Sequence, residues 1–251
     1  MIGEECWRIM PQPSGTSLIL PVDPVVPDTR GQLDLYLPST AGPAPCVLLV
    51  HGLYPEPPEV TPRFSNFYRD YASHLAHRGL VAAVIDHDLT HGFFYQEALV
   101  TVRDAVDRLR AAPETDENTV GMWFFSGGGP LSYPFLIEPA PWLRAVELTY
   151  PVLPGADTPG WPPPDNAIAG INVVPTLVTL VENEIPDFIL GQRAFVTQAS
   201  NASVPLEVRT VTGVGHGFDA VTDEPHARAA VAEGLDWMAT TLTSRRSFGR
   251  M

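Results

Sequence analysis

The stretch GMWFFSGGGP, residues 121–130, places a single serine between an aromatic run and three glycines. A strand that turns sharply into a helix exposes such a serine at the turn, in the strained geometry called a nucleophile elbow. Gly128 fits the position two residues after Ser126, where the chain passes close to itself, but Phe124 stands two residues before it, where glycine is usual. The alternative is an ordinary glycine-rich loop, so the surrounding sequence has to decide.

Strand-like and helix-like segments alternate along the chain. The expected strands cover residues 16–22, 32–38, 46–52, 80–88, 119–125, 143–152, 175–182 and 205–213. The expected helices cover residues 66–79, 97–113, 190–200 and 224–242. This order predicts a single domain over residues 1–251 with an α/β fold, a mostly parallel central sheet with helices on both faces, and no large lid domain. Such sheets carry their chemistry at the carboxyl ends of the strands, and Ser126 follows one of them.

Composition excludes several classes of function. The formal net charge of −14 opposes binding to nucleic acids and to anionic membranes. All 15 basic residues are arginines, which excludes the lysine of Schiff-base enzymes, pyridoxal-phosphate enzymes and P-loops. No apolar run is long enough to span a bilayer and the first residues do not read as a secretory signal, so a cytoplasmic protein is expected. Cys6 and Cys46 are expected to be free thiols.

A serine hydroxyl needs a general base before it can act as a nucleophile. His216 lies in the glycine-flanked segment TGVGHGFDA, directly after the last expected strand and before the closing helix. His74, His77 and His226 fall on the faces of expected helices, where nothing recommends them for catalysis. The segment DHDLTH, residues 86–91, could suggest a metal, but it follows a strand as a loop and no further ligand set accompanies it. We therefore expect no metal and no cofactor.

The order of these parts resembles the α/β-hydrolase fold, in particular its dienelactone hydrolase branch. The resemblance runs from LDLYLPSTAGPAPCVLLVHG at residues 33–52, through VGMWFFSGGG at 120–129, to GVGHGFD at 213–219 and the final helix. It covers nearly the whole chain. The branch uses a cysteine nucleophile, whereas this chain has Ser126, as the esterase-like relatives of the branch do.

The resemblance implies a role for each of four residues. Ser126 is implied as the nucleophile and His216 as the base. The backbone N–H groups of Leu53, just past the HG pair, and of Gly127 are implied as the oxyanion hole. Fixed amide donors in a dry site stabilise the negative charge that develops on an ester oxygen during attack. The alternative to an oxyanion hole is that the HG pair, His51 and Gly52, forms a plain tight turn after a buried strand.

The third catalytic member should be a carboxylate that orients His216 and stabilises its cation. In the family it follows a later strand, which here reads PTLVTLVENEIPDF, and the candidates are Glu182, Asn183, Glu184 and Asp187. If residues are counted from Pro175, which opens the strand, the family's aspartate position falls on Glu184. If they are counted from the pair Ile185 and Pro186, it falls on Asn183. We predict Glu184, with Glu182 second. The alternative is that the acid lies at another strand end, for instance at Asp157.

The sequence therefore predicts a serine hydrolase that acts on a small ester or lactone. Aromatic residues in two proline-rich stretches after strands could line an apolar substrate site, and they are Tyr54, Phe64, Phe67 and Trp161. The alternative is that these rings pack on the core and line no substrate site. The second hypothesis is a non-catalytic binding or accessory protein that keeps the fold, and Phe124 in the elbow motivates it. The sequence separates neither esterase from lactonase, peptidase or acyl-transfer activity, nor one oligomeric state from another.

Overall fold

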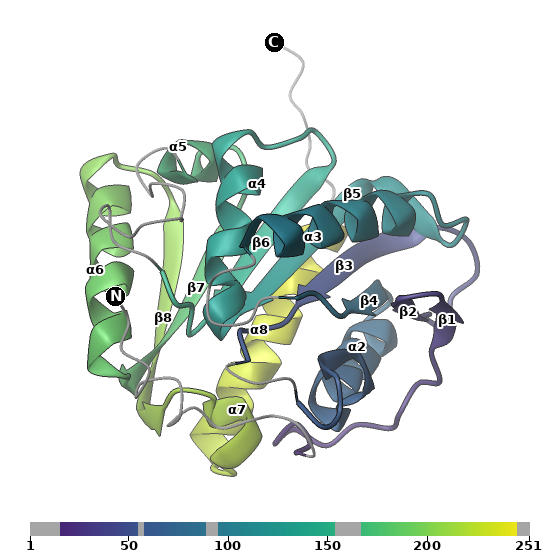
Figure 1. The fold of residues 1–251 in the computed structure, drawn as a ribbon, viewed down its shortest axis with the longest axis horizontal. Helices are drawn as coiled ribbons and strands as arrows, with labels where there is room; N and C mark the ends of the chain where they lie inside the picture. The colour runs from purple at the N-terminus through teal and green to yellow at the C-terminus, as the bar shows by residue number, and fades with distance from the viewer. Residues whose placement is uncertain (1–15, 55–57, 89–94, 154–166, 245–251) are drawn as a thin grey trace.

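An eight-stranded sheet forms the centre of the computed structural model, which describes residues 16–54, 58–88, 95–153 and 167–244 (Figure 1). The strand order is β1-β2-β4-β3-β5-β6-β7-β8. The strands are β1 Asp28–Arg30, β2 Leu33–Tyr36, β3 Ala44–Val50, β4 Val81–Ile85, β5 Thr115–Phe125, β6 Leu143–Thr149, β7 Thr176–Asn183 and β8 Leu206–Gly215. β2 pairs antiparallel with both β1 and β4, and all strands from β4 to β8 run parallel. The predicted fold class, a mostly parallel sheet, is confirmed.

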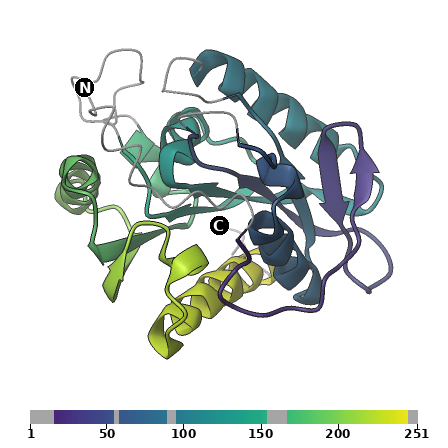
Figure 2. The same ribbon diagram turned by 60° about the horizontal axis from the view of Figure 1, so that its bottom comes forward.

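Helices cover both faces of the sheet, as predicted. The longer ones are α2 Asn66–His77, α3 Tyr95–Arg110, α6 Pro186–Asn201 and α8 Pro225–Thr243, and the shorter ones are α4 Tyr133–Ile137, α5 Ala167–Ile171 and α7 Phe218–Val221. Two 3₁₀ segments, η1 Pro62–Phe64 and η2 Ser126–Ser132, complete the set. Buried side chains of α3, α4, α5 and α6 pack against one face, and those of α2, α7 and α8 against the other. Figure 2 shows α2 and α8 together on one side of the sheet.

Strands β3 and β4 are apolar along their whole length because neither of their faces meets water. In β3, Leu48 belongs to the core on the α3 side, whereas Val47 and Leu49 belong to the core on the α8 side. Cys46 is a fully buried free thiol in the same strand, and burial raises its pKa to about 12. These strands rigidly fix the loops that follow their carboxyl ends.

The expected strand at residues 16–22 is wrong. Leu18 and Ile19 are buried, but their backbone N–H groups bind the Asp70 carboxylate and the Asp219 carbonyl oxygen instead of a neighbouring strand. His74 of α2 adds a bond of 3.0 Å between its Nε2 atom and the carbonyl oxygen of Leu20. A short apolar run packed against helices has the same sequence pattern as a buried strand.

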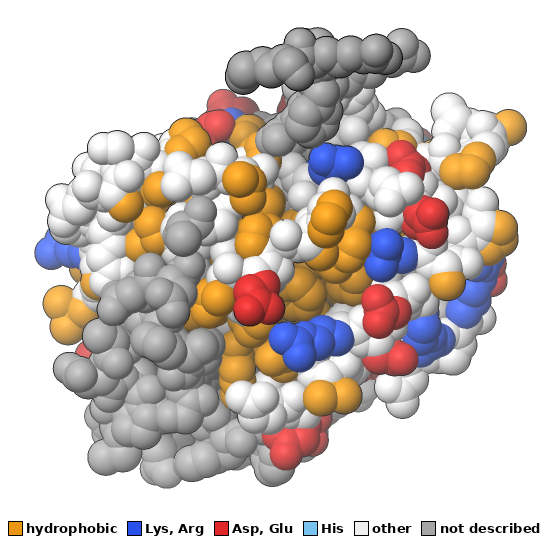
Figure 3. Space-filling view, turned by 90° about the horizontal axis from the view of Figure 1, so that it is seen from above, with side chains coloured by type: hydrophobic (Ala, Val, Ile, Leu, Met, Phe, Trp, Pro, Cys, Tyr) orange, Lys and Arg blue, Asp and Glu red, His pale blue; other side chains and the backbone are white. Residues whose placement is uncertain are grey.

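The surface of α3 carries ion pairs at helical spacing, Arg108 with Asp104 at 3.6 Å and Arg110 with Asp107 at 3.9 Å. Figure 3 shows basic and acidic side chains interspersed on the visible face, with hydrophobic side chains between them.

Within the described part of the chain, no helix is long and apolar enough to cross a bilayer.

Candidate active site

Ser126 lies at the carboxyl end of β5, where the chain turns into η2. Its φ angle is +47°, a left-handed conformation that costs free energy in a residue with a Cβ atom. Two contacts hold the turn: the Ser126 carbonyl oxygen accepts a bond of 2.8 Å from the N–H of Val152, and Gly52 lies against the Ser126 side chain. The geometry is that of the nucleophile elbow expected from the sequence.

The glycines around the elbow are required by close approach. A Cβ atom on Gly127 would lie 2.4 Å from the Cβ atom of Leu53, and one on Gly128 would lie 2.4 Å from the carbonyl oxygen of His51. Phe124, two residues before Ser126, is fully buried and packs towards Phe135 with ring centroids 6.4 Å apart. The ring therefore fills the core on the α3 side of the sheet.

His216 follows β8 and faces Ser126. Its Nε2 atom lies 2.7 Å from the Ser126 Oγ atom, and its Nδ1 atom lies 2.8 Å from the Oε1 atom of Glu184. Gly217, with φ at +70°, turns the chain away into α7 directly after the imidazole. Ser126 and His216 are 90 residues apart in sequence, and His216 and Glu184 are 32 apart. The three side chains are thus hydrogen-bonded in series.

Glu184 is the acid that the structure brings to His216. It is buried, and its two oxygens are fully engaged: Oε1 also accepts from the N–H of Ile185 at 2.8 Å, and Oε2 accepts from the side chain of Gln192 at 3.0 Å. Glu182 is exposed and accepts instead from the N–H of Gly213 at 2.6 Å.

The remaining candidate acids lie elsewhere. Asn183 is exposed and pairs with Gly215 within the sheet, and Asp187 is exposed in the first turn of α6. Asp157 is outside the described residues. Of the acids considered from the sequence, Glu184 is thus the one whose carboxylate contacts the imidazole.

This series of contacts fixes where the protons lie. A carboxylate only accepts hydrogen bonds, so the Nδ1 atom of His216 carries the imidazole proton. Its Nε2 atom is then free to accept the proton of the Ser126 hydroxyl. The arrangement can generate a nucleophilic oxygen and hold the imidazolium that results.

Leu53 and Gly127 meet beside Ser126. The backbone nitrogen of Leu53 lies 2.8 Å from the position that a Cβ atom would take on Gly127. Leu53 is buried. Two backbone segments from different strand ends are therefore brought together directly after Ser126.

Solved structures of other proteins share this architecture. An esterase of Pyrobaculum calidifontis superposes with a TM-score of 0.64 at 18% identity, covering 84% of this chain and 82% of that one. Esterase 2 of Thermogutta terrifontis, phosphorylated by paraoxon, gives 0.65 at 17% identity, covering 94% and 97%. A bacterial heroin esterase gives 0.66 at 19% identity, covering 93% and 87%.

The chain has the α/β-hydrolase fold. The likeness extends to a protein of Klebsiella pneumoniae described as a dienelactone hydrolase, with a TM-score of 0.64 at 16% identity over 86% of this chain and 97% of that one. No model of a known protein family matches the sequence. No curated protein matches it either. At these identities the likeness establishes the fold, which was predicted from the sequence.

The aromatic residues expected from the sequence to line a substrate site differ in position. Tyr54 is buried next to Leu53 and lines a cavity of about 360 Å³ together with His51 and His87. Phe64 is 52% exposed, with the Arg63 guanidinium 4.4 Å above its ring. Two further residues complete the set: Phe67 is buried in the core against Phe125, and Trp161 is outside the described residues.

His51 of the HG pair stacks on His87, with ring centroids 3.6 Å apart. His51 Nε2 accepts from the N–H of His87 at 3.0 Å, and its Nδ1 atom donates to the Gly52 carbonyl oxygen at 2.7 Å. Burial lowers the pKa of His51 to about 4, so the ring is neutral and braces the loop that carries Leu53. Among the described residues, no three His, Cys, Asp or Glu side chains form a metal-binding group, and His91 of DHDLTH lies outside them.

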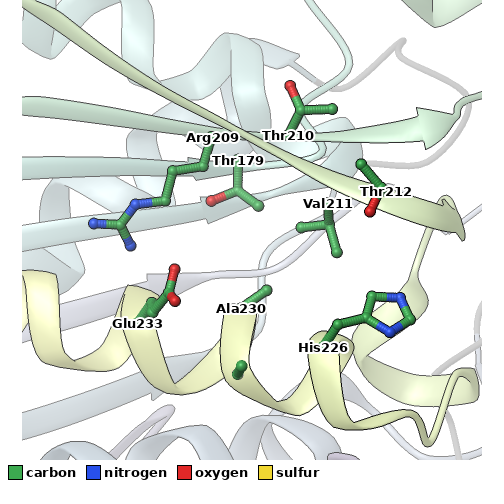
Figure 4. Close-up of a pocket in the computed structure, with 9 residues that line it drawn as sticks. Thr179, Arg209, Thr210, Val211, Thr212, His226, Ala230 and Glu233 are labelled. Atoms are coloured by element: carbon green, nitrogen blue, oxygen red, sulfur yellow. The ribbon is translucent and has the colours of Figure 1, made fainter.

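A second cavity, of about 400 Å³, lies between β7, β8 and α8. In Figure 4 the side chain of Arg209 extends from β8 towards α8, and the carboxylate of Glu233 rises from α8 towards the sheet. His226 lies at the other end of the cavity in the same view. None of the residues that line it belongs to the series of Ser126, so this cavity is separate from the candidate active site.

Sequence reasoning missed four residues around the site: Gln192, Tyr150, Tyr71 and Asp219. Gln192 is a buried polar residue on the inner face of α6, where the helical pattern calls for an apolar side chain. Asp219 follows His216 by three residues within the same motif. The sequence alone does not show that Asp219 is buried, so it gives no signal that separates Asp219 from a surface acid.

Proposed function

We propose that this protein is a serine hydrolase that cleaves small carboxylic esters or lactones through an acyl-enzyme on Ser126. The observation that carries the proposal is the series of hydrogen bonds from Ser126 Oγ to His216 and on to Glu184, at 2.7 and 2.8 Å. Nucleophile, base and acid come from the ends of three different strands, and this geometry of roles recurs in serine hydrolases.

In the acylation step, Ser126 Oγ attacks the carbonyl carbon of the substrate while His216 Nε2 accepts the hydroxyl proton. The carbonyl oxygen becomes an oxyanion, which the N–H groups of Leu53 and Gly127 stabilise by roughly 3 to 4 kcal/mol for each donor. The ester C–O bond then breaks and His216 returns its proton to the departing alcohol oxygen.

In the deacylation step, water takes the place of the alcohol. His216 Nε2 accepts a proton from the water as its oxygen attacks the acyl carbon, and the bond to Ser126 Oγ breaks as that oxygen regains the proton. Glu184 stabilises the imidazolium in both steps. Gln192 holds the second oxygen of Glu184, so the carboxylate keeps its orientation through the cycle.

An apolar acyl or alcohol group of the substrate is proposed to bind against Tyr54, Phe64 and Trp161. The cavity lined by Tyr54 supports the part of Tyr54 alone, because this cavity adjoins the loop of Leu53 but is lined neither by Phe64 nor by Ser126, His216 or Glu184. The names of the structural neighbours, which describe esterases and a dienelactone hydrolase, support an ester or lactone as the substrate class.

The alternative proposal, a non-catalytic binding protein with this fold, rests on Phe124 in place of the usual glycine. Phe124 is accommodated in the core, and the contact between Ser126 and His216 is formed despite it. Glu184 supplies the acid that the alternative requires to be missing. The observations therefore favour the hydrolase.

Labelling with a fluorophosphonate tests the proposal directly. The wild-type protein should be modified stoichiometrically on Ser126 and should hydrolyse short p-nitrophenyl esters, whereas Ser126→Ala should do neither while keeping its circular dichroism spectrum. Ser200→Ala, at an exposed serine of α6, serves as the matched control and should behave as wild type. Wild-type protein that resists both reagents across a broad ester panel would favour the binding protein.

A further inference from the structure

Asp219 is a fully buried carboxylate close to His216 that takes no part in the series of Ser126, His216 and Glu184. Its Oδ1 atom accepts a bond of 2.6 Å from the Tyr150 hydroxyl, and its Oδ2 atom accepts a bond of 2.7 Å from the Tyr71 hydroxyl. A buried carboxylate requires such donors, because ionisation without them is costly.

The two tyrosines lead in different directions. The Tyr71 ring, on α2, packs against Trp123 and Phe125 in the core, with ring centroids 5.2 and 5.0 Å apart. The Tyr150 ring, directly after β6, packs against the imidazole of His216, with ring centroids 4.8 Å apart. Tyr71 is thus an anchor in the core, and Tyr150 connects Asp219 to the candidate general base.

Tyr150 is held in a strained conformation. Its φ angle is +35°, and among the described residues only Ser126 and Ser203 are further non-glycine residues with positive φ. Its backbone N–H donates to the Thr179 carbonyl oxygen at 2.7 Å, while its hydroxyl is held by Asp219 at the other end of the side chain. Strain of this kind persists where the surroundings over-determine it, which is common at functional sites.

The charge of Asp219 also acts on His216. Burial raises the pKa of Asp219 to about 6, and the hydrogen bonds from Tyr150 and Tyr71 counteract part of that rise, as does the smaller attraction between Asp219 and the His216 cation. The phenols that face the carboxylate, Tyr68, Tyr71 and Tyr150, have pKa values raised well above 10 by burial and remain neutral. Within the described cluster, the Glu184 carboxylate contacts the imidazole directly, whereas the Asp219 carboxylate binds the hydroxyl of Tyr150, whose ring contacts the imidazole.

We propose that Asp219 and Tyr150 form a positioning unit for His216. This unit holds the imidazole against Ser126 and supports its cation, in addition to the support from Glu184. Glu184 binds the Nδ1 proton, whereas the positioning unit acts through the Tyr150 ring and through charge at longer range. The inference rests on the proposed hydrolase function and adds a second carboxylate to the apparatus around His216.

The matched pair Tyr150→Phe and Tyr71→Phe tests the positioning role. Each variant removes one hydroxyl from the same carboxylate, so each should lower thermal stability by a similar amount. Tyr150→Phe should also lower kcat by about tenfold, the factor for one hydrogen bond to a charged group, with KM near wild type. Tyr71→Phe should leave kcat near wild type. Equal effects of the two variants on kcat would show that the cluster is only structural.

The variant Asp219→Asn tests the contribution of charge. Removal of the anion disfavours the imidazolium, so the acid limb of the kcat/KM profile should move to lower pH. The pH dependence of the rate of fluorophosphonate labelling reports the same shift without any turnover. An unchanged acid limb would overturn the electrostatic part, and an insoluble variant would leave the tyrosine pair as the deciding test.

Failure of this proposal differs from failure of the proposed function. If wild type is not labelled by the fluorophosphonate, the hydrolase itself is wrong. If wild type is labelled and Tyr150→Phe is labelled at the same rate, the hydrolase stands and the positioning unit falls.

Discussion

The backbone of Gly128 lies so close to the end of β3 that a Cβ atom on it would be 2.4 Å from the carbonyl oxygen of His51 and 3.2 Å from that of Val50. Both obstacles are backbone atoms, one in the last residue of β3 and one in the residue after it, and they cannot rotate away as a side chain could. Gly128→Ala should therefore push η2 away from β3 and cost about 1 to 3 kcal/mol of stability, as overpacking does. The elbow would move with η2, so the rate of fluorophosphonate labelling should drop along with the melting temperature. If Gly128→Ala kept the wild-type labelling rate and melting temperature, the elbow would tolerate the added methyl group and the prediction would be wrong.

Glu184→Gln should lower turnover by on the order of 10⁴-fold, because a neutral amide neither stabilises the imidazolium nor fixes the tautomer of His216. KM should stay near wild type, since Glu184 is buried behind the imidazole. Glu182→Gln and Asn183→Ala are controls at exposed positions and should remain within a few-fold of wild type. Steady-state kinetics on one activated ester measures all three, and loss of activity in Glu182→Gln alone would reverse the assignment.

Arg63 of η1 and Asp34 of β2 form a buried ion pair at 3.1 Å, and Arg63 also pairs with Asp86 at 3.3 Å. Asp34→Ala should destabilise the protein by about 1 to 3 kcal/mol, because it leaves a buried Arg63 donor without its acceptor while Asp86 still compensates the charge. Asp28→Ala breaks the half-exposed pair with Arg30 and should cost no more than about 1 kcal/mol. Urea unfolding of both variants makes the comparison, and similar losses would contradict it.

Acid should destabilise the fold through His51. Burial lowers its pKa from 6.5 to about 4, so between these two values the unfolded chain binds a proton that the folded chain does not. The free energy of unfolding should fall as pH drops through that window. Burial lowers the pKa values of His87 and His74 too, which adds to the same trend, whereas Asp219, with its raised pKa, opposes it between about 4 and 6.

The pH dependence of unfolding in wild type and in His51→Gln isolates this contribution. The variant should be less stable at every pH, because its side chain does not reproduce the stacked contact with His87. Its stability should nevertheless decline less steeply from pH 6.5 to 4 than that of wild type. Parallel curves would place the acid sensitivity at other groups.

The sequence was sufficient to predict the sheet and the positions of Ser126 and His216. Parallel strands buried on both faces must be apolar throughout, so β3 and β4 are visible as continuous apolar runs. Ser126 stands out because glycines follow it directly after a strand, and His216 because glycines flank it on both sides after the last strand. These signals are local, and local signals survive in a single sequence.

The acid and its supports could not be settled in the same way. Glu182 and Glu184 lie two residues apart, and their difference arises where β7 ends: Glu182 binds the N–H of Gly213, while the chain beyond the strand turns Glu184 inwards to Gln192. The error at residues 16–22 has the same origin, since only tertiary packing separates a buried strand from a buried coil. Contacts between distant segments decide both cases.

The hydrogen bond from the N–H of Ile19 to the carbonyl oxygen of Asp219 links opposite ends of the described chain. In a polypeptide synthesised from its N-terminus, Ile19 emerges early but cannot reach its partner until α7 exists. The segment can bind Asp70 and His74 of α2 early, but its bond to Asp219 can form only after α7 has been made. Because Asp219 lies three residues beyond His216, completion of this early segment depends on the stretch of chain that carries the proposed base.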